Sequence, residues 1–381
     1  MARILIIRLS AIGDVAMTIP VVYAIAGSYP QDSFTVLTQT FLMPLFINKP
    51  PNLNIMGVNL KSTEKSFPGF MRYAFMLRKY NFDKVIDIHD VIRSRLAGLL
   101  FSLNGAKVYR IDKGRSLRRA LTARPPKIIR RLPTVIERYA AVFSAAGYEF
   151  KDNFVSLFES KPLDDSAVKT LTGVKSGRWI GVAPFAKHKG KIYPLDKMEK
   201  IVEALSQQVE TKVFLFGGRG DEGRILDGWS QKYSNVINTV GLFALDMELT
   251  LISRLDALIC MDSANMHFAS LTGTKVVSIW GATHPYAGFL GYHQSEALAV
   301  QRDLPCRPCS IYGNKPCYRG DWACLNGIEP EDILIHVIKG DSTGSHGTFA
   351  GAPGTFAGSH GTFAGAPGTS TESPRIFRNT S

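Results

Sequence analysis

The segment over residues 254–281 constrains the fold more than any other part of this chain. An apolar run over 255–261 ends in Asp262-Ser263, a helical pattern follows, and a β-rich run covers 275–280. This order of patterns indicates a strand–helix–strand unit. Because strands joined in this way lie parallel in one sheet with the helix across its face, the unit predicts an α/β fold.

A polar cluster lies where the first strand of this unit ends and its helix begins. It contains Asp262, Ser263 and, one turn later, His267. Open α/β sheets bind ligands at that edge, and a helix N-terminus offers unpaired N–H groups to a phosphate. The cluster therefore fits a site for a phosphate and a sugar. It equally fits an ordinary N-cap at Ser263 followed by a partly buried histidine.

The beginning of the chain has the same organisation. Residues 3–8 form a strand pattern, a short loop follows, and a helix is expected from about Asp14 to Gly27. Gly13 permits a tight turn, and Asp14 stands at the helix start, where a carboxylate is also a natural cap. The loop has no G-x-G-x-x-G pattern, so a dinucleotide-binding fingerprint is not supported.

Strand and helix patterns alternate along the rest of the chain, with a polar break near residues 160–177. Strands are expected over 33–37, 84–88, 179–183, 212–216 and 236–238, and helices over 93–103, 134–147, 195–208, 246–254 and 329–339 and after Gly220. This alternation predicts two parallel sheets in two domains. The expected organisation is a domain over 1–160, a linker over 161–177, a domain over 178–339 and a tail over 340–381.

Two peptides carry a resemblance to a known family. They are RLSAIGDVAMTIP at residues 8–20 and DSANMHFASLTGTKVVSIWGATHP at residues 262–285. Together they resemble glycosyltransferase family 9, the ADP-heptose:lipopolysaccharide heptosyltransferases, and the likeness extends more weakly over 1–338. The resemblance implies the GT-B architecture, in which two Rossmann-like domains face each other across a cleft. The family pattern usually has Gly where Ala264 stands here and often Pro at Asn265.

The resemblance also assigns roles to residues in both halves. Asp14 aligns with the family's catalytic aspartate, with Ser10 in the same acceptor-binding loop, and Lys191, three residues before Pro194, matches its phosphate-contacting lysine. Because the Asp-x-Asp metal motif of GT-A enzymes is not found, charge on the leaving diphosphate would be neutralised by the protein, with no cofactor required. The expected donor-binding residues are Lys191, Glu222, Asp262, Ser263, Ala264, Asn265 and His267.

Positive charge is concentrated in the first half. The chain has a formal net charge of +13, and thirteen Lys or Arg residues lie between Arg93 and Arg138 against only Asp112 and Glu137. Such a stretch fits an anionic partner or a merely solvated basic face. No nucleic-acid-binding module accompanies it, so an anionic glycolipid acceptor is favoured over nucleic acid. The expected acceptor-binding residues are Ser10, Arg93, Arg118 and Arg119.

Targeting signals are not recognisable in the chain. Arg8 and Asp14 interrupt the first apolar stretch, so it does not read as a signal peptide, and no apolar run approaches the length of a membrane span. The expected location is the cytoplasm, with peripheral attachment to the inner face of the cytoplasmic membrane.

Cysteines and a repeat mark the C-terminal part. A cysteine-rich segment over 306–324 has the spacing C-x2-C-x7-C-x6-C, which allows either a structural zinc site or reduced thiols that pack a loop. The four candidate ligands are Cys306, Cys309, Cys317 and Cys324.

Beyond residue 340, a Gly/Ala/Ser/Thr-rich sequence repeats with a period of about 14 residues. It is expected to be disordered, because it cannot bury enough apolar surface to fold alone.

These observations together predict an inverting, metal-independent glycosyltransferase. The expected reaction transfers a heptose or related sugar from ADP-heptose to a lipid A-linked lipopolysaccharide core acceptor. Two alternatives remain: a sugar-nucleotide epimerase of the same fold, or a non-catalytic protein that binds anionic glycans or nucleic acid.

Overall fold

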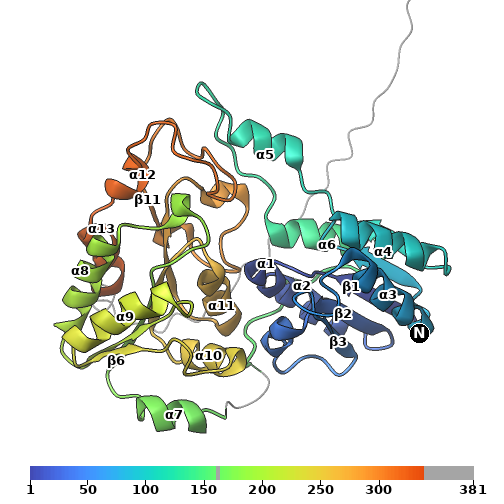
Figure 1. Cartoon of the computed structure of the whole chain (residues 1–381), viewed down its shortest axis with the longest axis horizontal. Coiled ribbons are helices and arrows are strands. Elements are labelled where there is room, and N and C mark those ends of the chain that lie inside the picture. The colour runs from blue at the N-terminus through green and yellow to red at the C-terminus, as the bar shows by residue number, and fades with distance from the viewer. Residues whose placement is uncertain (160–163, 339–381) are drawn as a thin grey trace, which may run out of the picture. The chain divides into compact units, whose positions relative to one another are not determined.

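Two parallel β-sheets organise the chain in the computed structural model, which describes residues 1–159 and 164–338. The first sheet has five strands that lie in the order β3 (Leu53–Val58), β2 (Ser33–Gln39), β1 (Arg3–Ile7), β4 (Lys84–Asp87) and β5 (Lys107–Arg110). Every strand pair is parallel, so each strand is followed by a crossover (Figure 1). The predicted α/β fold is thus confirmed in the first half.

The second sheet has six strands, again all parallel. Their order is β11 (Ala299–Gln301), β10 (Val276–Trp280), β9 (Ala257–Met261), β6 (Arg178–Ala183), β7 (Thr211–Leu215) and β8 (Val236–Asn238). The five residues of β9 are all buried, as expected for a central strand with helices on both of its faces.

Helices cover both faces of each sheet. In the first half these are α1 (Ile12–Ala16), α2 (Thr18–Ser28), α3 (Phe67–Leu77), α4 (Ile92–Ser102), α5 (Arg115–Leu121) and α6 (Val135–Ala145). The second half has α7 (Ser166–Thr172), α8 (Leu195–Ser206), α9 (Asp221–Lys232), α10 (Leu245–Ile252), α11 (Ala264–Thr272), α12 (Ala323–Asn326) and α13 (Pro330–Ile338). Short 3-10 turns are η1 (Thr40–Leu45), η2 (Arg78–Tyr80), η3 (Lys189–Lys191), η4 (Pro285–Ala287) and η5 (Glu296–Leu298).

Three hydrophobic cores hold these layers together. One core packs α3 and α4 on one face of the first sheet, and another packs α8, α9 and α13 on one face of the second. The third and largest includes α2, α6, α10 and α11 and runs through both halves. The described residues accordingly form one compact unit. The domain boundaries near 160 and 178 stay predictions.

Local sequence explains several of the element ends. At the start of α6, Thr134 Oγ accepts from the backbone N–H of Glu137, and the Glu137 carboxylate accepts from the N–H of Thr134. This reciprocal capping box satisfies two donors that a helix N-terminus otherwise leaves unpaired. Gly147, with φ +87°, follows the helix in a conformation that favours glycine.

Some elements differ from the sequence-based expectation. The single helix expected from Asp14 to Gly27 is two helices, α1 and α2, that meet at Met17. The strands β3, β5 and β11 were not anticipated, since polar residues or glycine interrupt the apolar residues of β3 and β5, and β11 is only three residues long. Part of the expected linker, residues 161–163, and the repeat tail over 340–381 lie outside the described residues.

Within the described part of the chain, every helix is too short or too polar to cross a bilayer.

Candidate active site

A cavity of about 760 Å³ is lined by residues from both halves of the chain. It lies beyond the carboxyl ends of β1 and β9, where α1 and α11 begin and approach each other. At the contact, a Cβ on Gly13 would lie 2.9 Å from Cδ2 of His267, so only glycine fits without displacing the histidine. This edge of the sheets is where open α/β folds bind their ligands.

Asp14 lies in the first turn of α1 and is fixed by two contacts. Its Oδ2 lies 2.7 Å from Nη2 of Arg8 and accepts a hydrogen bond from the N–H of Ala11 at 3.1 Å. Arg8 is itself buried and donates from Nη1 to the carbonyl of Ile88 at 2.6 Å. Both contacts to Asp14 use the same oxygen, which leaves Oδ1 to receive a proton.

His89 lies beside this loop and was not anticipated from the sequence. Its Nε2 is 3.4 Å from Oγ of Ser10, and its Nδ1 is buried with no hydrogen-bond partner among the residues that the structure describes. Burial, together with the charges of Arg8 and Lys113, lowers the pKa of His89 to about 3. The ring is therefore neutral at neutral pH.

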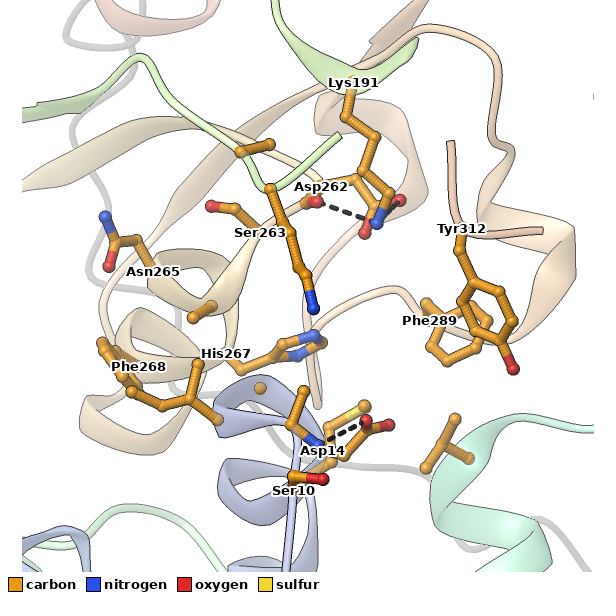
Figure 2. A pocket seen from close by; sticks show the side chains of 18 of the residues that line it. Ser10, Asp14, Lys191, Asp262, Ser263, Asn265, His267, Phe268, Phe289 and Tyr312 are labelled. Carbon is orange, nitrogen blue, oxygen red and sulfur yellow. Dashed lines mark hydrogen bonds and ion pairs between the residues drawn. The ribbon is translucent and has the colours of Figure 1, made fainter. Parts of the chain in front are cut away.

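Lys191 and Asp262 form an ion pair on the opposite wall (Figure 2). Lys191 Nζ lies 2.8 Å from Oδ2 of Asp262 and also donates to the Asp262 backbone carbonyl at 3.1 Å. Lys191 ends the turn η3 after β6, and Asp262 follows β9, which is the neighbour of β6 in the sheet. Asp262 was expected among the donor-binding residues, and in the structure its carboxylate pairs with Lys191.

The N-terminus of α11 faces the same cavity. Ser263 occupies the N-cap position, yet its side chain makes no capping hydrogen bond, and its Oγ is buried without a partner. Ala264 and Asn265 begin the helix, so their N–H groups are among those that an α-helix leaves unpaired. Ser263 thus holds the expected N-cap position without forming the side-chain capping hydrogen bond.

His267 lies one turn into α11, between the two walls (Figure 2). It is buried, and burial lowers its pKa to about 4 despite the nearby Asp262 and Asp14. Within the described part of the chain, its Nδ1 also has no hydrogen-bond partner. Near its N-terminus, α11 therefore places a neutral imidazole and a buried hydroxyl, the latter without a partner among the described residues, in the cavity wall.

A glycine-containing loop after β7 forms another part of the lining. Glu222 at the start of α9 accepts from the N–H of Gly218 at 2.6 Å, so its carboxylate holds the loop as well as facing the cavity. Glu248 of α10, which was not anticipated, also lines the cavity. Burial raises the pKa of Glu248 to about 7, so its charge changes near neutral pH.

The three arginines predicted to bind an acceptor fall in different places. Arg118 lines the cavity, where its Nη1 donates to the Tyr312 hydroxyl at 2.9 Å and its guanidinium lies 5.1 Å from the Phe289 ring centre. Arg119, the next residue of α5, is exposed and outside the cavity lining. Arg93 is also outside it and donates from Nη2 to the Lys65 carbonyl at 2.5 Å. Consecutive helical residues point in different directions, which sequence proximity does not reveal.

The cavity contains further charged residues that sequence reasoning missed. They come from elements distant in the chain and include Arg8, Lys113 and Arg138. One signal was present in the sequence: His89 and Asp90 follow the strand pattern at 84–88, just as Asp262 and Ser263 follow β9. Polar residues at strand ends could have identified that edge.

The cysteine-rich segment does not support the zinc alternative. Cys306, Cys309, Cys317 and Cys324 line one small cavity, but among the described residues no three His, Cys, Asp or Glu side chains are grouped to hold a metal. Burial raises the pKa of Cys324 to about 11 and also that of Cys309, which favours protonated thiols. All of these cysteines are free. Their spacing contains only one C-x-x-C pair, so the second pair expected of a zinc site is missing.

The two parallel sheets, with a cavity between the first turns of α1 and α11, define a GT-B type fold. Residues 71–316 match the family model described as glycosyltransferase family 9 (heptosyltransferase). The chain therefore belongs to glycosyltransferase family 9. This result confirms the resemblance seen in the peptides at residues 8–20 and 262–285.

Similar proteins agree with this assignment. Lipopolysaccharide heptosyltransferase 1 of Campylobacter coli is 23% identical over 348 residues, which cover 87% of this chain and 97% of that protein. Lipopolysaccharide heptosyltransferase 3 of Escherichia coli is 24% identical over 284 residues, covering 71% and 80%. The solved structure of Escherichia coli ADP-heptose LPS heptosyltransferase II has a TM-score of 0.63 at 21% identity, covering 88% and 98%. That structural likeness shows the same fold.

Proposed function

We propose that this protein transfers a heptose or related sugar from ADP-heptose to a lipid A-linked lipopolysaccharide core acceptor, with inversion and without a metal ion. The observation that carries the proposal is a single cavity with Asp14 on one wall and Lys191 and the α11 N-terminus on the other. A base and an anion-binding wall that face one cavity are what transfer from a nucleotide diphosphate sugar requires. Relatives named as lipopolysaccharide heptosyltransferases support the choice of sugar and acceptor.

In this proposal Asp14 acts as the general base. It would take the proton of the acceptor hydroxyl as the oxygen attacks the anomeric carbon of the sugar, and the bond from that carbon to the diphosphate would break. Arg8 holds the Asp14 carboxylate by its 2.7 Å contact and so keeps the base in one orientation. Ser10, in the loop before α1, would contact the acceptor beside it.

The leaving diphosphate would be stabilised on the opposite wall. Lys191 supplies a positive charge, while the N–H groups of Ala264 and Asn265 and the Ser263 hydroxyl supply hydrogen bonds. His267 would contact the diphosphate as a neutral ring, and Glu222 would accept from ribose hydroxyls. Asp262 holds Lys191 through its 2.8 Å ion pair. A solved structure of Escherichia coli heptosyltransferase WaaC with ADP supports a nucleotide donor for this fold.

The proposed reaction is tested by incubating the purified protein with ADP-heptose and a soluble, delipidated core acceptor. We expect the acceptor to gain the mass of one heptose while ADP is released. ADP-glucose and UDP-glucose serve as controls for the sugar and the nucleotide. Binding of ADP-heptose without product, at every acceptor tested, would contradict the enzymatic proposal and favour a non-catalytic binder.

Arg118 and Arg119 provide a matched pair for the acceptor half. We expect Arg118→Ala to raise the acceptor KM by about tenfold, because a charged hydrogen-bond donor is removed from the cavity wall. Arg119→Ala removes the same charge just outside the cavity and should change KM much less. The affinity for ADP should stay unchanged in both variants. Equal KM values for the two variants on the soluble acceptor would contradict an acceptor role for Arg118.

A further inference from the structure

Glu248 has no part in the reaction proposed above, yet it lines the same cavity. It lies in the first turn of α10 and is partly buried. No donor or cation in the part of the chain that the structure describes contacts its carboxylate. Burial alone raises the pKa of this carboxyl to about 7, as expected where no neighbouring charge compensates it. Such a group costs stability unless a ligand supplies the missing hydrogen-bond donor.

The strand order places Glu248 at one end of the cavity. Along the carboxyl edge of the second sheet the strands follow in the order β9, β6, β7 and β8. Asp262 follows β9 and Lys191 follows β6, so these two strands carry the wall expected to hold the diphosphate. The glycine-containing loop with Glu222 follows β7, and α10 with Glu248 follows β8. Along this edge, Glu222 therefore separates Glu248 from the diphosphate wall.

The two loops at this end of the cavity lie against each other. A Cβ on Gly241, in the loop from β8 to α10, would lie 3.3 Å from Nε of Arg219 in the loop after β7. On its other side, α10 packs against α11, whose first turn faces the cavity (Figure 1). The first turn of α10 is thus held between the ribose-side loop and the helix of the diphosphate wall.

A nucleotide that follows this order would bring its base to Glu248. Its diphosphate would lie at Lys191 and its ribose at Glu222, while Phe216 and Leu245 in the cavity lining offer apolar surface to a flat ring. Adenine carries a 6-amino donor beside its N1 acceptor. A carboxyl group accepts from an amino group in either charge state, and in its protonated state it also donates. Guanine and hypoxanthine have a keto oxygen in place of that amino group.

We propose that Glu248 makes the donor site selective for adenine, by accepting a hydrogen bond from the 6-amino group of the base. The proposal rests on the proposed function, because it needs a nucleotide-sugar donor in this cavity. It adds a base-selecting residue to the diphosphate and ribose contacts. The ligand then supplies the donor that the protein lacks, so a carboxyl that destabilises the free protein contributes affinity in the complex.

Isothermal titration of the full chain with ADP and with inosine diphosphate tests the proposal. Inosine diphosphate differs from ADP by a keto oxygen in place of the 6-amino group. At about pH 8.5 the carboxyl is above its raised pKa and has no proton to donate to that oxygen. We expect the parent to bind ADP about ten- to a hundredfold more tightly than inosine diphosphate, because a hydrogen bond to a charged acceptor is lost.

Two variants of Glu248 should lose this preference in opposite ways. Glu248→Ala removes the acceptor, so ADP binding should weaken by about tenfold or more, whereas inosine diphosphate binding should not weaken. Glu248→Gln keeps an acceptor and adds an amide donor, so ADP binding should stay near the parent value and inosine diphosphate should bind more tightly. The control Asp246→Ala, at an exposed position of the same turn outside the cavity lining, should keep the parent preference.

The Tm should not fall in either Glu248 variant, because this carboxyl has no partner within residues 1–159 and 164–338. An unchanged ADP preference in both variants, or an equal loss of both nucleotides, would overturn the role of Glu248. Weaker binding of ADP-heptose but not of ADP by Glu248→Ala would place the carboxyl on the sugar and would also overturn it. These outcomes leave the proposed donor intact, whereas a parent that binds neither nucleotide would contradict the proposed function together with this proposal.

Discussion

Asp14→Asn is expected to lower the rate of sugar transfer by roughly 10²–10⁴-fold, the usual contribution of a positioned general base. Asparagine keeps the size of the side chain and can still accept from the Ala11 N–H at the start of α1. It cannot take a proton from the acceptor hydroxyl. The affinity for ADP-heptose should change little, because the diphosphate groups are expected on the other wall. Steady-state kinetics with the soluble acceptor, together with donor titration, checks both expectations.

The Asp14 variant needs a control for folding. Buried Arg8 loses its charged partner at 2.7 Å, and an unpaired buried charge destabilises a protein. Tm and ADP-heptose binding therefore have to be measured beside the rate. Asp246→Asn changes an exposed carboxylate outside the cavity lining and should retain full activity. A well-folded, donor-binding Asp14→Asn protein that transfers sugar at the parent rate would show that the base lies elsewhere.

Lys191→Ala is expected to weaken donor binding and to slow transfer by about ten- to a hundredfold, because the developing charge on the diphosphate loses its cation. The matched control is Lys189→Ala, which removes an exposed lysine two residues earlier in the same turn. That variant should bind and transfer almost normally. Isothermal titration with ADP and steady-state kinetics measure the two effects separately.

The ion pair with Asp262 complicates the Lys191 variant and also sharpens the test. Asp262 is 3% exposed, so removing the lysine leaves a buried carboxylate unpaired. The double variant Lys191→Ala/Asp262→Asn removes that penalty, so recovery of Tm without recovery of transfer would assign the lost rate to the lysine charge. EDTA should leave the parent rate unchanged. Activity that EDTA abolishes and magnesium restores, at constant Tm, would contradict the metal-independent mechanism.

Local sequence was sufficient for the class of fold and for much of the candidate site. Buried parallel strands such as β9 are continuous apolar runs, and the polar residues that follow them mark the ligand edge of the sheet. Ser263 and His267 could be chosen in this way, whereas the family resemblance selected Asp14 and Lys191; all four line the cavity. The strands β3 and β5 could not be recognised, because Asn54 and Gly57 interrupt the apolar residues of β3 and β5 begins and ends with a cation.

The sequence by itself determined the α/β class and the two family motifs, which follow the strands β1 and β9. Only the tertiary structure decided which charges meet. The crossovers place β4 beside β1 and β6 beside β9, so Arg8 reaches the Ile88 carbonyl and Lys191 pairs with Asp262. The direction of each side chain on α5 likewise separates Arg118 from Arg119. These contacts depend on strand order and helix rotation, which join residues far apart in the chain and which no local pattern encodes.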